Sequence, residues 1–110
     1  MVSVTIQSIT SKTLKNYFDT ERSFVLFDVR EPSEFEICQI DGSILVPFSE
    51  LEDHLPDFDK DKEYIVYCKT GKLSVDACKI MKKQGFKKVR YLKDGIYAWI
   101  DQIETYLEKY

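Results

Sequence analysis

The apolar positions of the sequence form two kinds of pattern, and the first kind predicts strands. Two runs are apolar almost without interruption, FVLFDV at residues 24–29 and YIVYC at residues 64–68. Such runs are typical of strands that are buried on both faces of a sheet. Shorter runs at residues 4–9, 43–47 and 88–92 predict further strands.

The second pattern places an apolar residue at every third or fourth position, which predicts helices between the strands. The first helix has Leu14, Tyr17 and Phe18 as its apolar face, with Ser11 as the expected N-cap. The segment EPSEFEI at residues 31–37 predicts one or two further helical turns. The remaining stripes are Phe48, Leu51 and Leu55, ended by Pro56; Val75, Cys78 and Met81, ended by Gly85; and Ile96, Ile100, Ile103 and Leu107.

The alternation of strands and helices predicts an α/β fold built around a parallel sheet. In such sheets the functional site lies in the loops that follow the carboxyl ends of the strands. Cys68 is the last residue of the run at residues 64–68. We therefore expect the site to lie around Cys68.

Composition narrows the class of protein further. The chain has 110 residues, of which 44% are hydrophobic and 32% charged, a balance typical of one globular domain. Its net charge of -3, with both signs interspersed, gives no basic face for nucleic acid. No apolar run approaches the roughly 20 residues that span a bilayer. Residues 1–12 also lack the basic and apolar regions of a signal peptide. We expect a cytoplasmic protein with neither a nucleic-acid partner nor a membrane partner.

The sequence contains three cysteines, Cys38, Cys68 and Cys78. An odd number without close pairing predicts free thiols in a cytoplasmic protein. There is no C-x-x-C motif, and the one histidine, His54, has no obvious partner ligand, so no zinc site is predicted. We expect neither a metal nor an organic cofactor. Cys78 falls on a helical stripe and is expected in the core.

The segment CKTGKLS, residues 68–74, joins the second buried run to the following helix. A strand-to-helix loop can direct several backbone N–H groups inward, where they and the positive end of the helix dipole form an anion site. Gly71 permits the curl of the backbone, and Lys69 and Lys72 add positive charge. A thiol in this environment is expected to ionise readily and to act as a nucleophile without a histidine. The alternative is that Cys68 is a small buried residue before an ordinary polar loop.

Three blocks of sequence resemble the rhodanese-like sulfurtransferase domain, in the right order along the chain: residues 27–51, 66–74 and 85–103. They contain DVREPSEF, the cysteine loop and LKDGIYAW, whose joint occurrence is specific. The resemblance extends over nearly the whole chain, so we expect one rhodanese-like domain at residues 1–110. It implies a three-layer α/β/α sandwich with a five-stranded parallel sheet in the order 3-2-4-5-1.

The resemblance also implies the chemistry of the cysteine loop. Cys68 matches the cysteine that carries a sulfane sulfur as a persulfide, at the start of a loop that ends at Leu73 and whose backbone amides surround the sulfur. The residues expected to form this substrate-binding loop are Lys69, Thr70, Gly71, Lys72 and Leu73, and those expected to support it are Asp28, Arg30 and Ser74. Phosphatases of a related fold have a cysteine, then five other residues, then an arginine that holds the phosphate. This chain has Ser74 there, so a phosphatase is disfavoured.

Several positions depart from the family pattern. Lys69 replaces a common arginine and lacks its planar fork, and Leu73 removes a polar contact to an anionic donor, so weak activity with thiosulfate is predicted. Asp94 replaces the first of two glycines and adds negative charge on the side of the sheet that carries the site. The usual GHIPGA is CQIDGS at residues 38–43, which introduces Cys38 as either a resolving thiol or a tolerated small residue.

Asp28 and Arg30 end the predicted strand that is expected to neighbour the Cys68 strand. The residue types allow these side chains to orient the cysteine loop or to help hold an anion. Pairing with Glu31 or Glu34, which follow directly, is favoured over either role.

The sequence therefore predicts a sulfurtransferase. Its donor is expected to be thiosulfate, a low-molecular-weight persulfide or a protein persulfide, and its acceptor a thiol or similar nucleophile. Two alternatives stay open: a catalytically weak or silent rhodanese-like module that binds or regulates a partner, and a sulfur-carrier domain detached from a larger enzyme. For the latter, GIYAWIDQIETYLEKY at residues 95–110 resembles the tail of adenylyltransferases that activate sulfur-carrier proteins.

Overall fold

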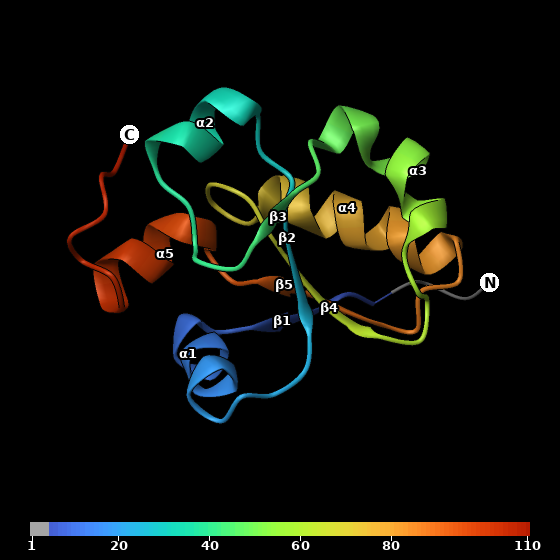
Figure 1. Cartoon of the computed structure of the whole chain (residues 1–110), viewed down its shortest axis with the longest axis horizontal. Coiled ribbons are helices and arrows are strands. Elements are labelled where there is room, and N and C mark those ends of the chain that lie inside the picture. Colours follow the sequence, from blue (N-terminus) through green and yellow to red (C-terminus); the bar gives the residue numbers. More distant parts are fainter. Residues whose placement is uncertain (1–4) are drawn as a thin grey trace.

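The computed structural model describes residues 5–110, so Val4, with which the first predicted strand begins, lies outside the described residues (Figure 1). Within that range five strands form one sheet: β1 (Gln7–Ile9), β2 (Val25–Asp28), β3 (Ile44–Leu45), β4 (Glu63–Tyr67) and β5 (Lys88–Leu92). The helices are α1 (Ser11–Asp19), α2 (Pro32–Ile37), α3 (Leu51–His54), α4 (Lys72–Lys83) and α5 (Gly95–Gln102), and two 3-10 helices, η1 (Phe48–Glu50) and η2 (Leu55–Asp57), flank α3.

The sheet is parallel throughout, and its strands lie in the order β1-β5-β4-β2-β3. This confirms the predicted order 3-2-4-5-1, read from the other edge. β2 and β4 are neighbours, with Phe27 opposite Val66 and Asp28 opposite Tyr67. Because all strands point the same way, the end of β2 and the start of the loop after β4 meet at one edge of the sheet.

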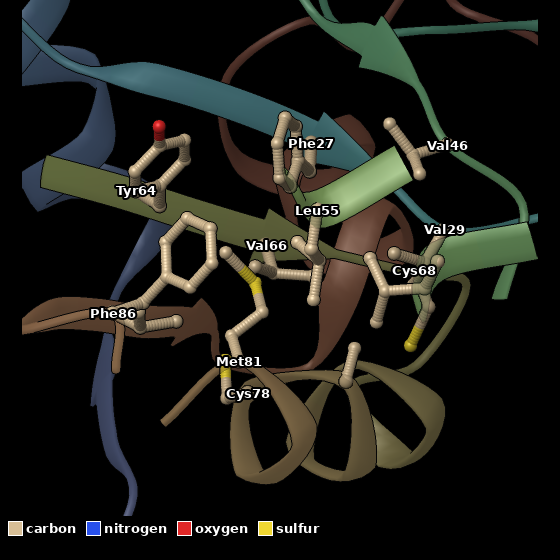
Figure 2. Close-up of a cluster of buried hydrophobic side chains, with 13 residues drawn as sticks. Phe27, Val29, Val46, Leu55, Tyr64, Val66, Cys68, Cys78, Met81 and Phe86 are labelled. Carbon is tan, nitrogen blue, oxygen red and sulfur yellow. The ribbon is translucent and has the colours of Figure 1, made fainter. Parts of the chain in front are cut away.

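Helices cover both faces of the sheet, which gives the predicted α/β/α layers (Figure 1). Successive side chains of a strand point to opposite faces, and β4 follows this rule. Tyr64 and Val66 belong to the cluster under α3 and α4, which also contains Leu51, Leu55, Cys78 and Met81 (Figure 2). Ile65 and Tyr67 belong to the cluster under α1 and α5, with Leu14, Tyr17, Ile96 and Trp99.

Aromatic contacts tie the first of these clusters together. Phe27 of β2 lies 4.9 Å from Phe58 and 5.2 Å from Tyr64 between ring centroids. Tyr64 in turn makes an edge-on contact with Phe86, 5.2 Å away (Figure 2). Phe27–Phe58 and Tyr64–Phe86 are edge-to-face pairs, which stabilise a core by about 0.5–1.5 kcal/mol each beyond the area that they bury. The strand that leads to Cys68 is therefore firmly anchored.

Helix boundaries differ from the sequence prediction at the start of α1 and around Pro56. The N-cap of α1 is Thr10, whose side chain accepts a hydrogen bond from the Thr13 N–H at 3.1 Å, and Ser11 is the first helical residue. The prediction of Ser11 as the cap was wrong by one position because both residues carry a suitable hydroxyl. Pro56 lies inside η2 and does not end a helix, since a 3-10 or α-helix tolerates proline in its first turn.

The carboxyl-terminal segment also departs from the prediction. The apolar stripe predicted a helix that continues to Leu107, but α5 ends at Gln102. The N–H groups of Ile103 and Glu104 both donate to the carbonyl of Trp99, which turns the chain. Ile103 and Leu107 still pack against the cluster under α5. Their apolar character therefore reflects burial of the segment and not a continued helix. None of the helices in residues 5–110 combines the length and the apolar character needed to cross a membrane.

Candidate active site

Cys68 follows β4 directly, at the carboxyl edge of the sheet. The alternation along β4 places its side chain on the same face as Tyr64 and Val66, toward α4 (Figure 2). The residue is 3% exposed. The predicted position at the end of a central strand is confirmed.

The sulfur of Cys68 accepts hydrogen bonds from two backbone N–H groups, which we call the amide cradle. Gly71 N lies 3.1 Å and Ser74 N 3.4 Å from Sγ. The Ser74 hydroxyl, 3.5 Å from the sulfur, donates to the Gly71 carbonyl at 2.9 Å, which closes the turn. Gly71 has φ +103, a left-handed conformation that glycine adopts without strain.

The turn at Gly71 shortens the loop relative to the prediction. Helix α4 begins at Lys72, whereas the sequence indicated a start at Ser74. Lys72 and Leu73 therefore belong to the first helical turn, and residues 68–71 alone form the Cys68 loop. The sulfur lies at the amino-terminal end of a helix of 12 residues, where the helix dipole favours negative charge.

The start of α5 supports the Cys68 loop from behind. The N–H groups of Ile96 and Tyr97 donate to the carbonyls of Cys68 and Lys69, at 2.9 and 3.2 Å. A Cβ atom at Gly95 would lie 2.4 Å from the Lys69 oxygen, so only glycine fits. Asp94, expected to add negative charge near the site, lines a separate hollow with Thr10, Lys12 and Lys93, and not the cavity beside Cys68.

A cavity of about 350 Å³ lies beside the sulfur, and we call it the Cys68 cavity. Of the predicted loop residues, Lys69, Thr70, Lys72 and Leu73 line it, and Leu73 is 37% exposed. Three carboxylates that sequence reasoning did not assign to the site also line it: Glu31, Glu34 and Asp76. Glu31 and Glu34 follow the strand next to β4, so strand order could have placed them here. Asp76 lies one turn into α4 from Lys72.

Arg30, which also lines this cavity, forms a buried ion pair with Asp28. Arg30 Nη2 lies 2.7 Å from Asp28 Oδ2, and both side chains are at most 1% exposed. The preferred pairing of Arg30 with Glu31 or Glu34 was therefore wrong: in the buried site Asp28, two residues away, supplies the charge. Burial lowers the pKa of Arg30, but the hydrogen bonds that Arg30 donates to Asp28 and to the Tyr110 hydroxyl outweigh this effect and raise the pKa above its ordinary value.

Arg30 has little capacity left for a substrate. Its Nη2 also donates to the carbonyl of Cys38 at 2.7 Å, and its Nη1 donates to the Tyr110 hydroxyl at 2.7 Å. The ring centroid of Tyr67 lies 5.7 Å from Arg30 Cζ, and the pKa of Tyr67 is raised, mainly by burial. We conclude that Arg30 forms part of the cavity wall, with its charge paired to that of the buried Asp28.

The two N–H groups of the amide cradle bond to Cys68, and the other two cysteines stand outside it, although Cys78 belongs to the same buried cluster as Cys68. Cys78 is fully buried under the sheet, and burial raises its pKa to about 12. Cys38 is buried in the cluster on the opposite face of the sheet from Cys68. The structure therefore does not bring Cys38 and Cys68 together as a resolving pair would require.

No group of three His, Cys, Asp or Glu side chains in residues 5–110 is arranged to hold a metal ion. His54 is exposed, and its Nε2 lies 3.6 Å from Glu50. Its surroundings are those of a surface side chain.

Comparison with known proteins identifies similar chains. Residues 10–102 match the family model for the rhodanese-like domain. The putative sulfurtransferase YtwF of Bacillus subtilis is 32% identical over 94 residues, which cover 86% of this chain and 90% of YtwF. The crystal structure of a rhodanese-like domain protein from Staphylococcus aureus superposes with a TM-score of 0.83 at 27% identity, covering 96% of this chain and 99% of that one.

A longer relative is also similar. The probable adenylyltransferase/sulfurtransferase MoeZ of Mycobacterium tuberculosis is 36% identical over 105 residues. The match covers 94% of this chain but only 27% of MoeZ. This chain therefore spans about a quarter of that relative.

Proposed function

The chain belongs to the rhodanese-like domain family, and we propose that it is a sulfurtransferase that carries a sulfane sulfur on Cys68. One observation carries this proposal. The Cys68 sulfur accepts two backbone N–H bonds at the amino-terminal end of α4 and borders a cavity of about 350 Å³. A structural cysteine needs no such donors and no adjoining space, whereas a nucleophilic sulfur benefits from both.

The proposed reaction has two steps. In the first, the Cys68 thiolate attacks the outer sulfur of a persulfide R–S–SH. A new S–S bond forms on Cys68, the donor's S–S bond breaks, and RSH leaves with the proton. In the second, an acceptor thiolate attacks the outer sulfur of the Cys68 persulfide, which restores the Cys68 thiolate. No external oxidant or reductant is consumed.

The amide cradle supports both steps. The N–H groups of Gly71 and Ser74 stabilise negative charge on the Cys68 sulfur when it attacks and again when it leaves. The outer sulfur of the persulfide extends into the Cys68 cavity, where Lys69 and Lys72 lie on the wall. These roles rest on the position of each group relative to the sulfur.

The charges of the cavity favour a persulfide over thiosulfate as the donor. Thiosulfate is a compact dianion, and Glu31, Glu34 and Asp76 all line the cavity that it would enter. The guanidinium of Arg30 is paired with Asp28 and is not free to clamp sulfonate oxygens. Leu73 adds an apolar, partly exposed surface in place of a polar one.

A second candidate function is that of a sulfur-relay domain that receives its sulfur from a protein persulfide and passes it to a protein acceptor. The match to a part of MoeZ favours it, because that relative is named as both an adenylyltransferase and a sulfurtransferase. The two candidates share the Cys68 chemistry and differ in donor and acceptor. A silent binding module is less well supported. One of the two departures from the family pattern that favoured it was the negative charge of Asp94, and Asp94 does not line the Cys68 cavity.

The function is tested by measuring sulfur transfer to a small thiol acceptor from glutathione persulfide and, separately, from thiosulfate. We expect turnover with the persulfide, weaker turnover with thiosulfate, and none with either donor for Cys68→Ser. The matched control is Cys78→Ser, which removes a buried thiol outside the amide cradle and is expected to retain turnover. Turnover in Cys68→Ser equal to that of the wild type would contradict the proposal.

A further inference from the structure

The side chain of Tyr110 connects Arg30 and Glu34, which line the Cys68 cavity, to Tyr97 of α5. Its hydroxyl accepts a hydrogen bond from Arg30 Nη1 at 2.7 Å and donates one to Glu34 Oε2 at 2.7 Å. Its ring makes an edge-on contact with Tyr97 of α5, at 5.7 Å between centroids. These contacts fix the ring from its tip and from its edge.

The ammonium group of Lys69 lies against both of these rings. Its Nζ is 4.8 Å from the ring centroid of Tyr110 and 5.3 Å from that of Tyr97. Within residues 5–110, no carboxylate forms an ion pair with Lys69. Lys69 also lines the Cys68 cavity. Its charge is therefore held beside the cavity by aromatic faces and remains available to an anion.

We propose that Tyr110 is a positioning residue that acts through Lys69, by holding the Lys69 ammonium at the edge of the Cys68 cavity. A lysine side chain on the surface samples many rotamers, and attraction to an aromatic face selects among them. The hydroxyl bonds of Tyr110 to Arg30 and Glu34 keep the ring in place, so the preferred position of the ammonium is set before a donor binds. A donor that carries negative charge then meets a cation that needs no reorganisation.

In the proposed sulfur transfer, Tyr110 would help to determine which donors bind, and this part of the inference rests on the proposed function. Loss of the Tyr110 ring is expected to raise KM for an anionic donor while kcat changes little, because the contact aids binding of the charge and not breakage of the S–S bond. The inference about Lys69 itself can be tested without any sulfur donor. Two alkylating reagents of similar size, one anionic and one neutral, report on the cation beside Cys68 when their rates are compared.

The test compares iodoacetate, an anion, with iodoacetamide, which is neutral, as reagents for Cys68 in the native protein. The rate constant for label on Cys68 is measured by peptide mapping with each reagent, and their ratio cancels changes in sulfur reactivity common to both. We expect Tyr110→Leu to lower the iodoacetate-to-iodoacetamide ratio by about twofold to fivefold, the effect of losing one exposed cation–π contact. Tyr110→Phe retains the ring and loses only its anchoring hydroxyl, so a smaller decrease is expected.

Three further variants separate a positioning role of Tyr110 from structural damage. Tyr106→Leu is the matched control, because Tyr106 belongs to the same segment, is 78% exposed and, within residues 5–110, makes its side-chain hydrogen bond to Glu104 alone. It is expected to leave the ratio unchanged. Lys69→Met is expected to lower the ratio, and adding Tyr110→Leu to it is expected to cause no further decrease.

The proposal is overturned if Tyr110→Leu leaves the ratio at the wild-type value, or if it lowers the ratio equally in the Lys69→Met background. These outcomes are distinguishable from a failure of the proposed function. If the ratios follow the expected pattern but wild-type protein transfers no sulfur, the sulfurtransferase proposal fails and the positioning role of Tyr110 stands.

Discussion

Among substitutions of a single turn glycine by alanine, Gly95→Ala should lower the free energy of unfolding most. Gly95 has φ +64, and a Cβ atom there would lie 2.4 Å from the Lys69 oxygen and 2.5 Å from the Cys68 oxygen. Both atoms belong to the backbone of the Cys68 loop, so no side chain can rotate away to make room. Either α5 or the Cys68 loop must move.

The expected cost has two parts. The left-handed backbone conformation costs a residue with a Cβ about 1–2 kcal/mol. If α5 moves away, the bonds from Ile96 and Tyr97 to the Cys68 and Lys69 carbonyls are lost, at about 0.5–1.5 kcal/mol each. We therefore expect Gly95→Ala to lower the free energy of unfolding by about 2–5 kcal/mol, a large part of the about 5–15 kcal/mol that stabilises a typical protein.

Gly42→Ala is the matched control. Gly42 also has a left-handed φ, +84, but a Cβ there would meet no atom within 4 Å, so only the conformational part of about 1–2 kcal/mol applies. Urea unfolding of both variants gives the two free energies. The alkylation rate of Cys68 should also change in Gly95→Ala and stay constant in Gly42→Ala. Equal destabilisation of the two variants, with an unchanged Cys68 rate, would refute the close-contact argument.

The remaining predictions concern the donor, the buried ion pair and the pH dependence of stability. Leu73→Arg and Lys69→Arg should each raise turnover with thiosulfate by about tenfold through a new charge-assisted hydrogen bond, and a wild type that already strongly prefers thiosulfate and gains nothing would refute this. Asp28→Asn should lower the free energy of unfolding by about 3–5 kcal/mol in urea titrations, because Arg30 stays buried without its counter-charge; a loss below 1 kcal/mol would contradict it. Burial raises the pKa of Cys78 to about 12, so from about pH 9 to 12 the unfolded chain has lost a proton that the folded protein retains. Stability should fall as pH rises through this window, and Cys78→Ala should reduce that slope by about 1.4 kcal/mol per pH unit; an unchanged slope would contradict the buried thiol.

Much of the fold could be predicted because its signals are local. The buried runs at residues 24–29 and 64–68 became the neighbouring strands β2 and β4, since a strand covered on both faces needs apolar side chains on both. The order of the sheet came from the family resemblance and not from periodicity. Periodicity failed at Leu107, where apolar spacing continued beyond the end of α5 because packing alone required it.

The candidate site was predictable in its loop and not in its surroundings. The sequence placed Cys68 and Gly71 at a strand-to-helix turn, and the structure has them there. The partner of Arg30 was not predictable, because Asp28, Glu31 and Glu34 all lie within reach along the chain and burial decides between them. The contact of Tyr110 with Arg30 joins residues 80 positions apart, which no local pattern signals.

The central claim is that Cys68, and no other thiol of the chain, carries the sulfur. Intact-protein mass spectrometry after incubation with glutathione persulfide, followed by removal of the donor, tests it directly. The wild type, Cys38→Ser and Cys78→Ser should each gain the mass of one sulfur atom, which a reducing agent removes, and Cys68→Ser should gain none. A sulfur gained by Cys68→Ser, or none gained by the wild type, would contradict the claim.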